Sequence, residues 1–137
     1  MHFEYNVIEG DFANAGKASS EIKKTMKQLN IDSQKIKRMV VAVYEAEVNA
    51  IAHAYGGNIY VDIDSEKISV IIKDTGPGIK DIELAMQQGY STASAKVREM
   101  GFGAGMGLPN IKNNVDHLDI KSEIGVGTEI KMVVNFT

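Results

Sequence analysis

The sequence predicts an α+β fold, a two-layer α/β sandwich in which helices cover one face of a mixed, mostly antiparallel sheet. Three observations support this prediction. A strand pattern precedes two long helical patterns, a short loop then joins two strands as a hairpin, and a second hairpin closes the chain. Strands and helices do not alternate as they would in a doubly wound fold. With 137 residues, the chain is expected to form one domain over residues 1–137.

The N-terminal part is expected to hold one strand and one helix. His2 to Val7 alternates loosely between apolar and polar residues, which indicates a strand. Asp11 or Asn14 can cap a helix that runs to about Asn30, because apolar residues recur there at steps of three and four. This stripe, which we expect to be buried, consists of Ala15, Ala18, Ile22, Met26 and Leu29.

A second helix is expected from a cap at Asp32 or Ser33 to about Ala54, where two glycines would end it. The strand that begins at Lys67 is apolar and β-branched, so it is predicted to be central. The remaining predicted elements are strands at Asn58–Asp64 and Lys67–Lys73, a short helix at Ile79–Gln88, a long mobile loop at Gly89–Gly105, a helix at Gly107–Val115, and strands near Asp119–Glu123 and Thr128–Phe136.

Composition argues against several classes of protein. The formal charge of −3 and the pI of about 5.6 argue against nucleic acid as a partner. Without cysteine, the chain can form neither disulfides nor thiolate metal sites. The N-terminus lacks the layout of a signal peptide, and the longest apolar stretch is too short and too charged to span a bilayer. We therefore expect a cytoplasmic protein that does not bind membranes.

Glu45, Asn49 and His53 recur every four residues on the second predicted helix and therefore form a column. Their neighbours on that side are the small residues Ala42, Ala46 and Ala52. A carboxylate, an amide and an imidazole among small residues suggest the lining of a cleft. The alternative is a polar helix face in which alanine serves as a helix former. Glu47, near the apolar side, has no predicted role beyond a helix edge or a partner charge.

Two glycine-rich segments can approach a ligand closely. In Asp74–Ile79, the glycines let the backbone come near a flat ligand, and the carboxylate suits an exocyclic amino group. An ordinary turn explains this segment equally well. Gly101–Leu108 has alternate glycines and runs into a helix, so its N–H groups can surround phosphate oxygens. A flexible linker is the weaker alternative here. No P-loop, dinucleotide, zinc-protease or protein-kinase motif is present.

Together these motifs resemble those of the GHKL superfamily of ATP-binding domains, which have the Bergerat fold. Four motifs in the family order, spread over most of the chain, carry the resemblance. They are E-x-x-x-N at Glu45–Asn49, D-x-G-x-G at Asp74–Gly78, a glycine-rich stretch that opens a helix at Gly103–Leu108, and G-x-G-T-E at Gly125–Glu129. The short length and the segment 89–92 also resemble the bacterial anti-sigma and stressosome switch serine kinases. These phosphorylate STAS-domain antagonist proteins or bind regulatory partners.

The resemblance implies a role for each motif. Glu45 would be the base that takes a proton from the attacking hydroxyl, and Asn49 would ligate the Mg²⁺ that bridges the phosphates of ATP. Asp74 would hold the adenine amino group. The further ATP-binding residues that it implies are Gly76, Gly78, Ile79, Gly103, Ala104, Gly105, Met106, Gly107, Leu108 and Thr128. The segment Gly89–Gly101 would form a lid, in which Lys96 or Arg98 would contact the γ-phosphate, unless both are solvated loop charges.

The function implied is an ATP-dependent protein-serine/threonine kinase and anti-sigma-type regulator that phosphorylates a STAS-domain partner. A sigma factor, a regulatory phosphatase and a second copy of the chain are further candidate partners. One alternative is a nucleotide-gated switch with little turnover, which would need Asn49 and Asp74 but not the base Glu45. Another is the catalytic domain of a sensor histidine kinase. Against it, the sequence shows no long helical hairpin to carry a phospho-accepting histidine.

Overall fold

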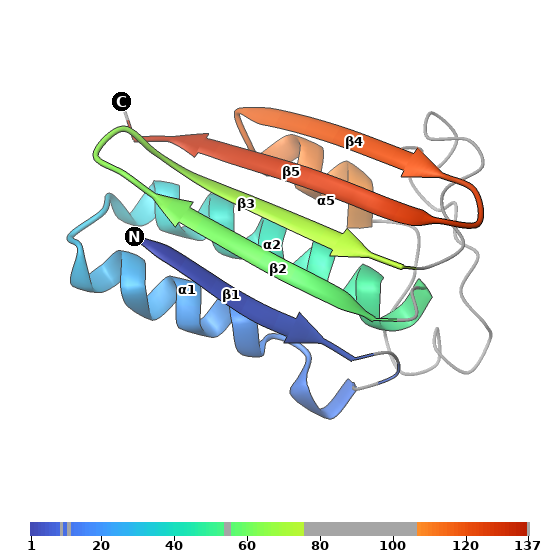
Figure 1. The fold of residues 1–137 in the computed structure, drawn as a ribbon. Helices are drawn as coiled ribbons and strands as arrows, with labels where there is room; N and C mark the ends of the chain where they lie inside the picture. Colours follow the sequence, from blue (N-terminus) through green and yellow to red (C-terminus); the bar gives the residue numbers. More distant parts are fainter. Residues whose placement is uncertain (9, 11, 54–55, 76–106, 137) are drawn as a thin grey trace.

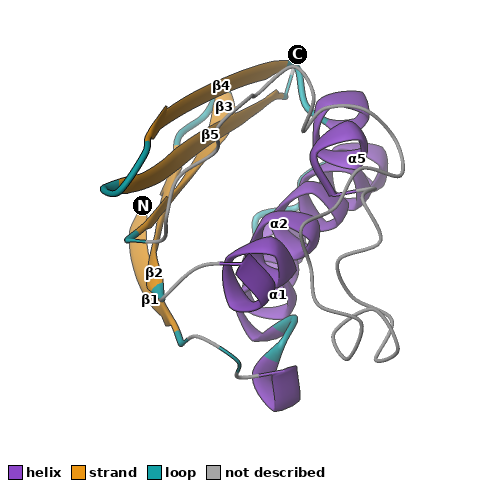
Figure 2. Cartoon of the chain, turned by 90° about the vertical axis from the view of Figure 1, so that its right-hand side faces the viewer, coloured by secondary structure: helices purple, strands orange, loops and turns teal. Residues whose placement is uncertain are grey.

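A five-stranded sheet is covered on one face by helices (Figures 1 and 2). The computed structural model describes residues 1–8, 10, 12–53, 56–75 and 107–136. The strands in this part are β1 (His2–Val7), β2 (Gly57–Ile63), β3 (Lys67–Asp74), β4 (His117–Glu123) and β5 (Gly127–Asn135). The helices are α1 (Lys17–Gln28), α2 (Ser33–His53) and α5 (Gly107–Asn114), with a 3₁₀ turn η1 at Phe12–Asn14. The predicted helix at 79–88 and the predicted loop at 89–105 lie outside the described residues.

The sheet has the strand order β1-β2-β3-β5-β4, and each of these four pairings is antiparallel. β3 lies in the middle, as its apolar, β-branched sequence predicts. In the loop between β2 and β3, Oδ1 of Asp64 accepts the N–H groups of Glu66 and Lys67 at 2.7 and 2.9 Å, which closes the hairpin. The predicted fold class, with helices on one face of a mostly antiparallel sheet, is confirmed; among the described strands the sheet is antiparallel throughout and not mixed.

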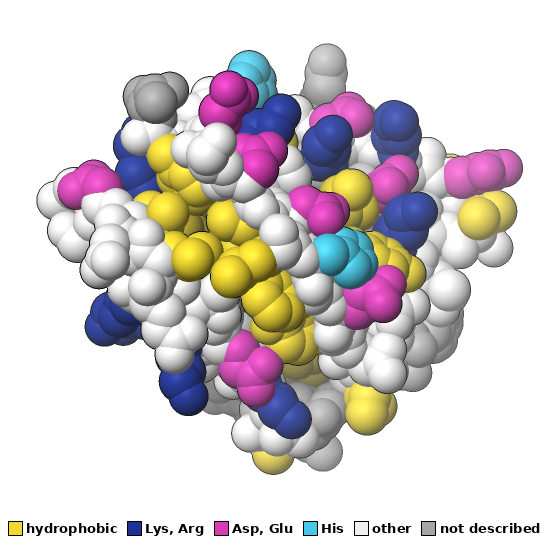
Figure 3. Space-filling view, turned by 60° about the vertical axis from the view of Figure 1, so that its left-hand side comes forward, with side chains coloured by type: hydrophobic (Ala, Val, Ile, Leu, Met, Phe, Trp, Pro, Cys, Tyr) yellow, Lys and Arg dark blue, Asp and Glu magenta, His cyan; other side chains and the backbone are white. Residues whose placement is uncertain are grey.

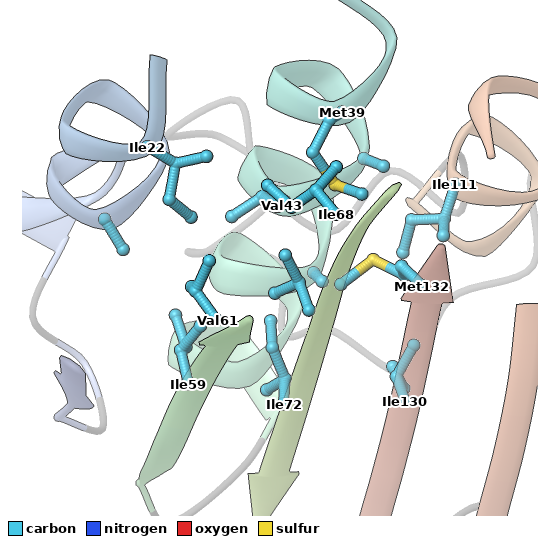
Figure 4. Packing of buried hydrophobic residues seen from close by; sticks show 14 of the residues in the cluster. Ile22, Met39, Val43, Ile59, Val61, Ile68, Ile72, Ile111, Ile130 and Met132 are labelled. Carbon is cyan, nitrogen blue, oxygen red and sulfur yellow. The ribbon is translucent and has the colours of Figure 1, made fainter. Parts of the chain in front are cut away.

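The core lies between the sheet and the helices (Figure 4). Ile68, Val70 and Ile72 of β3 are at most 1% exposed, because alternate side chains of a strand point to the same face. The helices contribute the fully buried side chains Ile22, Met26, Met39, Val43 and Ile111. Burying one side chain of this size stabilises the fold by about 1.5–3 kcal/mol. This core holds α2 against β3 and β5, and so fixes where the polar face of α2 lies.

The start of α1 differs from its prediction. Its N-cap is Gly16, not Asp11 or Asn14. Gly16 has a φ of 92°, a left-handed conformation that glycine adopts at little steric cost. Asn14 belongs to the 3₁₀ turn η1, and Asp11 lies outside the described residues. The N-cap provides no side-chain hydrogen bond to α1, so this helix depends on another part of the chain for its first N–H groups.

Two predictions about burial were wrong. Leu29 is 38% exposed, because it is the C-cap of α1 and not the last member of its buried stripe. Ala42 and Ala46 are at most 1% exposed and belong to the core, so they do not line a cleft beside Glu45. The physical reason is that α2 packs against α1 and α5 as well as the sheet, so its buried surface is wider than one stripe.

Arg38 of α2 joins three elements. Its Nε donates to the carbonyl oxygen of Asn114 at 3.0 Å, and its Nη2 donates to Oδ1 of Asp116 at 2.8 Å. Oδ2 of Asp116 accepts the N–H of Asn135 at 2.7 Å. The guanidinium, and after it this N–H, hold the pKa of Asp116 below its usual value. The contact ties α2 to the C-terminal ends of α5 and β5.

Some hydrophobic side chains are at least partly exposed on the surface. Figure 3 shows a band of hydrophobic surface between charged side chains on one side of the molecule. Several hydrophobic residues are only partly buried against the core, among them Phe3, Tyr5, Ile31 and Val40. Within the described part of the chain, no helix is both long and apolar enough to cross a membrane.

Candidate functional site

The predicted site residues within the described part lie on the C-terminal half of α2, at the end of β3 and at the starts of α5 and β5. The end of β3 and the starts of α5 and β5 are at the right of Figure 1. Glu45 and Asn49 are one turn apart on α2, and both are half-buried. Asp74, also half-buried, is the last residue of β3 and is directly paired with Thr128 of β5. The fold therefore brings residues from three predicted motifs, separated in the sequence, to one end of the molecule.

Glu45 is held by an amide that the sequence did not single out. Nδ2 of Asn110 donates to Oε1 of Glu45 at 3.3 Å, and both side chains are half-buried. Leu108 and Ile111, which are 7% and 0% exposed, anchor α5 in the core on either side of Asn110. A lone asparagine in a helix has no recognisable pattern. The only signal was its position three residues after Gly107, in the helix that the glycine-rich motif opens.

Asp74 is fixed at the end of β3 by the neighbouring strand. Its Oδ1 accepts the backbone N–H of Thr128 at 3.1 Å. Thr128 is 7% exposed, and its hydroxyl oxygen lies 2.9 Å from that of Ser122 on β4. Next to Asp74, the N–H of Thr75 donates to the carbonyl oxygen of Gly56 at 3.2 Å. A carboxylate held in this way is oriented before any ligand arrives, which lowers the cost of binding. Sequence reasoning missed Ser122, which supports Thr128 from β4.

Two glycines let the neighbouring strands approach the end of β3. A β-carbon at Gly127 would lie 2.0 Å from the carbonyl oxygen of Asp74, and the φ of Gly127 is 149°. On the other side, a β-carbon at Gly57 would lie 2.2 Å from the carbonyl oxygen of Lys73. No side chain fits at either distance unless the backbone moves. The close approach at Gly127 explains the second glycine of the G-x-G-T-E motif.

The predicted phosphate-binding segment is described only at its end. Gly107 is the first residue of α5, and Leu108 lies in the core. The other predicted nucleotide-binding residues lie outside the described residues: Gly76, Gly78, Ile79, Lys96, Arg98, Gly103, Ala104, Gly105 and Met106. The side chain of His53, the third member of the predicted column on α2, also lies outside. The assignments of these residues stay predictions.

Glu47 belongs to the opposite side of α2 and contacts α1. Its side chain is 4% exposed, and its Oε2 accepts the N–H of Ala18 at 3.3 Å. Its Oε1 has no hydrogen-bond partner among the described residues. Burial raises the pKa of Glu47, and the N–H groups of Ala18 and its neighbours oppose that rise. Glu47 thus supplies the acceptor that the N-cap of α1 lacks, and it is not part of the site around Glu45.

Comparison with known proteins identifies the family of the chain. Residues 8–134 match the family model of the histidine kinase-like ATPase domain. The serine/threonine-protein kinase RsbT of Bacillus subtilis (strain 168) is 31% identical over 111 residues, which cover 78% of this chain and 77% of RsbT. The anti-sigma F factor of Thermoanaerobacter sp. (strain X514) is 34% identical over 110 residues, which cover 77% of this chain and 73% of that protein.

Solved structures share the fold. The crystal structure of the RsbU and RsbW domains of a Mycobacterium tuberculosis protein aligns with a TM-score of 0.66 at 13% identity, and the alignment covers 98% of this chain but 32% of that longer one. The mycobacterial sensor histidine kinase MprB aligns with a TM-score of 0.55 at 20% identity, covering 98% and 97% of the two chains. Identities this low establish the fold alone. With the family model and the two relatives, the conclusion is that the chain belongs to the histidine kinase-like ATPase (GHKL) family of ATP-binding domains and is related to RsbT and the anti-sigma F factors.

Proposed function

We propose that this protein is an ATP-dependent protein-serine/threonine kinase that phosphorylates a small STAS-domain partner. The observation that supports it most is the presence of Glu45 one turn from Asn49, with Oε1 of its carboxylate held by Asn110. A domain that only binds nucleotide needs no carboxylate at this place. RsbT, which is 31% identical, is a serine/threonine-protein kinase by name.

The residues present fit Mg²⁺ and ATP. Mg²⁺ prefers oxygen ligands and keeps several waters, so the amide oxygen of Asn49 together with phosphate oxygens would suffice. Among the described residues, no group of three or more histidine, aspartate or glutamate side chains can hold a metal ion, so the nucleotide would supply most ligands. When bound, Mg²⁺ would neutralise charge on the phosphates. Asp74, fixed by Thr128, would accept a hydrogen bond from the adenine amino group.

The protein itself forms no covalent bond to the phosphoryl group in the proposed reaction. The proton of the partner's serine or threonine hydroxyl passes to a carboxylate oxygen of Glu45, and the hydroxyl oxygen forms a bond to the γ-phosphorus. The bond from the γ-phosphorus to the bridging oxygen breaks, and its electron pair leaves with ADP. Because Glu45 and Asn49 are one turn apart on α2, both can face the same γ-phosphate.

The partners are proposed by class. The substrate would be a STAS-domain anti-sigma antagonist, and a sigma factor or a regulatory phosphatase would be a second partner. The anti-sigma F factors among the relatives support regulation of this kind. We propose that the protein acts in the cytoplasm, where these partners are found, and that two copies can form a homodimer. Stress-response regulation and control of transcription follow from the same partners.

A second candidate function is a nucleotide-gated switch that binds a partner with little turnover. The relatives named anti-sigma F factor favour it, because an anti-sigma factor acts by binding. The catalytic domain of a sensor histidine kinase is a third candidate. The likeness to MprB supports the fold of this candidate only.

The experiment is an incubation with γ-labelled ATP, Mg²⁺ and the STAS-domain proteins encoded beside this protein. The kinase proposal expects acid-stable label on a serine or threonine of one partner, and far less label with the Glu45→Gln variant. If no partner is labelled but one binds in a nucleotide-dependent way, the switch replaces the kinase. Acid-labile label on a histidine would instead support the histidine-kinase alternative.

A further inference from the structure

The contact between Asn110 and Glu45 joins the two helices that border the site. Nδ2 of Asn110 lies 3.3 Å from Oε1 of Glu45, and both side chains are half-buried. An amide nitrogen can only donate, and an ionised carboxylate can only accept, so the direction of this bond is fixed. Because it engages one oxygen, the carboxylate cannot turn about its last bond without losing the contact.

The helix that carries Asn110 is itself held in place. Its buried residues Leu108 and Ile111 pack in the core. At its other end, the carbonyl oxygen of Asn114 accepts a hydrogen bond from Nε of Arg38 at 3.0 Å, and Nδ2 of Asn114 donates to the carbonyl oxygen of Asn110 at 2.7 Å. The Asn110 amide therefore comes from a fixed helix and not from a loop, as accurate positioning requires.

We propose that Asn110 is a positioning residue for phosphoryl transfer: its amide orients Glu45 so that one carboxylate oxygen faces the partner's hydroxyl. This inference rests on the proposed kinase function. The hydroxyl proton moves to the Glu45 oxygen that the amide does not hold, the hydroxyl oxygen bonds to the γ-phosphorus, and ADP leaves with the bridging oxygen and its electron pair. Asn110 exchanges no proton in this step and acts only through Glu45.

Asn110 lies close in sequence to the predicted phosphate-binding segment. α5 begins at Gly107, the last glycine of the predicted phosphate-binding segment, and Asn110 is in the first turn of that helix. The same fixed helix therefore carries the end of the predicted phosphate-binding segment and the amide that holds Glu45.

The test compares Asn110→Ala with Asn113→Ala. Asn113 lies on the same helix, is exposed and has the same side chain, so its substitution is a matched control. We expect Asn110→Ala to lower kcat for transfer of γ-labelled phosphate to the STAS-domain substrate by roughly tenfold, within the loss of up to about 10²-fold that misplacement of a reacting group causes. The dissociation constant for Mg·ATP should stay within about twofold, because Asn110 acts on Glu45 and not on the nucleotide. Asn113→Ala should change neither value.

A double substitution separates positioning from general loss of structure. In the Glu45→Gln background, where no base is left to orient, Asn110→Ala should cause little further loss of kcat. A full additional tenfold loss, or an unchanged kcat in the single Asn110→Ala variant, would overturn the proposal while the kinase function stands. Should Asn110→Ala fold poorly, the isosteric Asn110→Asp, which lacks the donor and places a second carboxylate beside Glu45, is expected to lose kcat at least as strongly.

A measurement without nucleotide tests the contact itself. In the NMR spectrum of the nucleotide-free protein, the side-chain amide protons of Asn110 should shift on Glu45→Ala, whereas those of Asn113 should not. Absence of that shift would refute the contact. If the wild-type protein labels no partner, the kinase function fails and the positioning role fails with it, whatever the NMR result.

Discussion

The close approach of β5 to β3 beside Asp74 can be tested by adding one methyl group. In Gly127→Ala, the new β-carbon would lie 2.0 Å from the carbonyl oxygen of Asp74 and 3.2 Å from Cα of Thr75. Both neighbours are backbone atoms, so no rotation of a side chain relieves the contact. The β5 strand must move away from β3, and the hydrogen bond from Thr128 to Asp74 must lengthen.

The magnitude follows from two terms. A left-handed or otherwise positive φ costs a residue with a β-carbon about 1–2 kcal/mol. Overpacking against backbone adds about 1–3 kcal/mol, so Gly127→Ala should lower the free energy of unfolding by roughly 2–5 kcal/mol. Gly125 is the matched control. Its φ is 81°, but apart from its two chain neighbours no described residue has an atom within 4 Å of the position that a β-carbon would take there. Gly125→Ala should therefore lower the free energy of unfolding only by the contribution of the positive φ, about 1–2 kcal/mol.

Urea unfolding, followed by circular dichroism, measures both variants. The lower entropy of an unfolded chain with alanine affects both alike, so their difference reports the close approach. Calorimetric titration with Mg·ADP should show at least about tenfold weaker binding for Gly127→Ala, a change of about 1.4 kcal/mol, because Asp74 loses its support. Equal losses of stability in the two variants, or ADP binding unchanged by Gly127→Ala, would refute this reasoning.

Three further predictions concern single side chains. Asp74→Asn should sharply weaken ADP binding in calorimetry, because the amide would turn a donor toward the adenine amino group; unchanged affinity would remove Asp74 from the adenine site. The raised pKa of Glu47 means that the native state holds its proton more tightly, so stability to urea should fall as pH rises from 4.5 through that pKa, and Glu47→Gln should lack this fall. Arg38→Ala should cost about 1–2 kcal/mol at neutral pH. Because the pKa of Asp116 is lowered from 3.8 in the native state, this carboxylate stabilises the fold above pH 3.8, and that stabilisation is lost as the pH falls further. Arg38→Ala should therefore lose less free energy of unfolding on acidification than the wild-type protein. Equal losses in the two proteins would contradict the role of this pair.

Much of the fold could be predicted because local patterns and tertiary packing agree there. The predicted bounds of β1 are the observed ones. Within the described part, the predicted bounds differ by at most one residue for β2, β3, α2 and α5. The apolar, β-branched sequence of β3 and the two glycines that follow α2 are strong local signals. The start of α1 was predicted wrongly, because Gly16, with its positive φ, takes the place of a polar N-cap. The acceptor for the N–H of Ala18 comes instead from Glu47 on another helix.

The candidate site was predictable only where motifs mark it. Asp74 and Thr128 belong to motifs with recognisable spacing, and the structure pairs them directly on β3 and β5. That they bind adenine stays a prediction. Asn110 could not be foreseen, since its importance depends on the packing of α5 against α2 and on a contact between residues 65 apart in the sequence. Ala42 and Ala46 misled for a related reason: a small residue on a helix suits a cleft and a close helix contact equally well.

In the proposed kinase, Glu45 acts on the rate of transfer and Asn49 on the affinity for Mg·ATP. The most direct measurement is the single-turnover rate of labelled phosphate transfer to the STAS-domain partner, taken beside the Mg·ATP dissociation constant, in Glu45→Gln and Asn49→Ala. Glu45→Gln should bind Mg·ATP with nearly normal affinity and transfer phosphate about 10²–10⁴-fold more slowly. Asn49→Ala should bind Mg·ATP more weakly, since it removes a ligand to the metal. A Glu45→Gln variant that transfers phosphate at the wild-type rate would contradict the account.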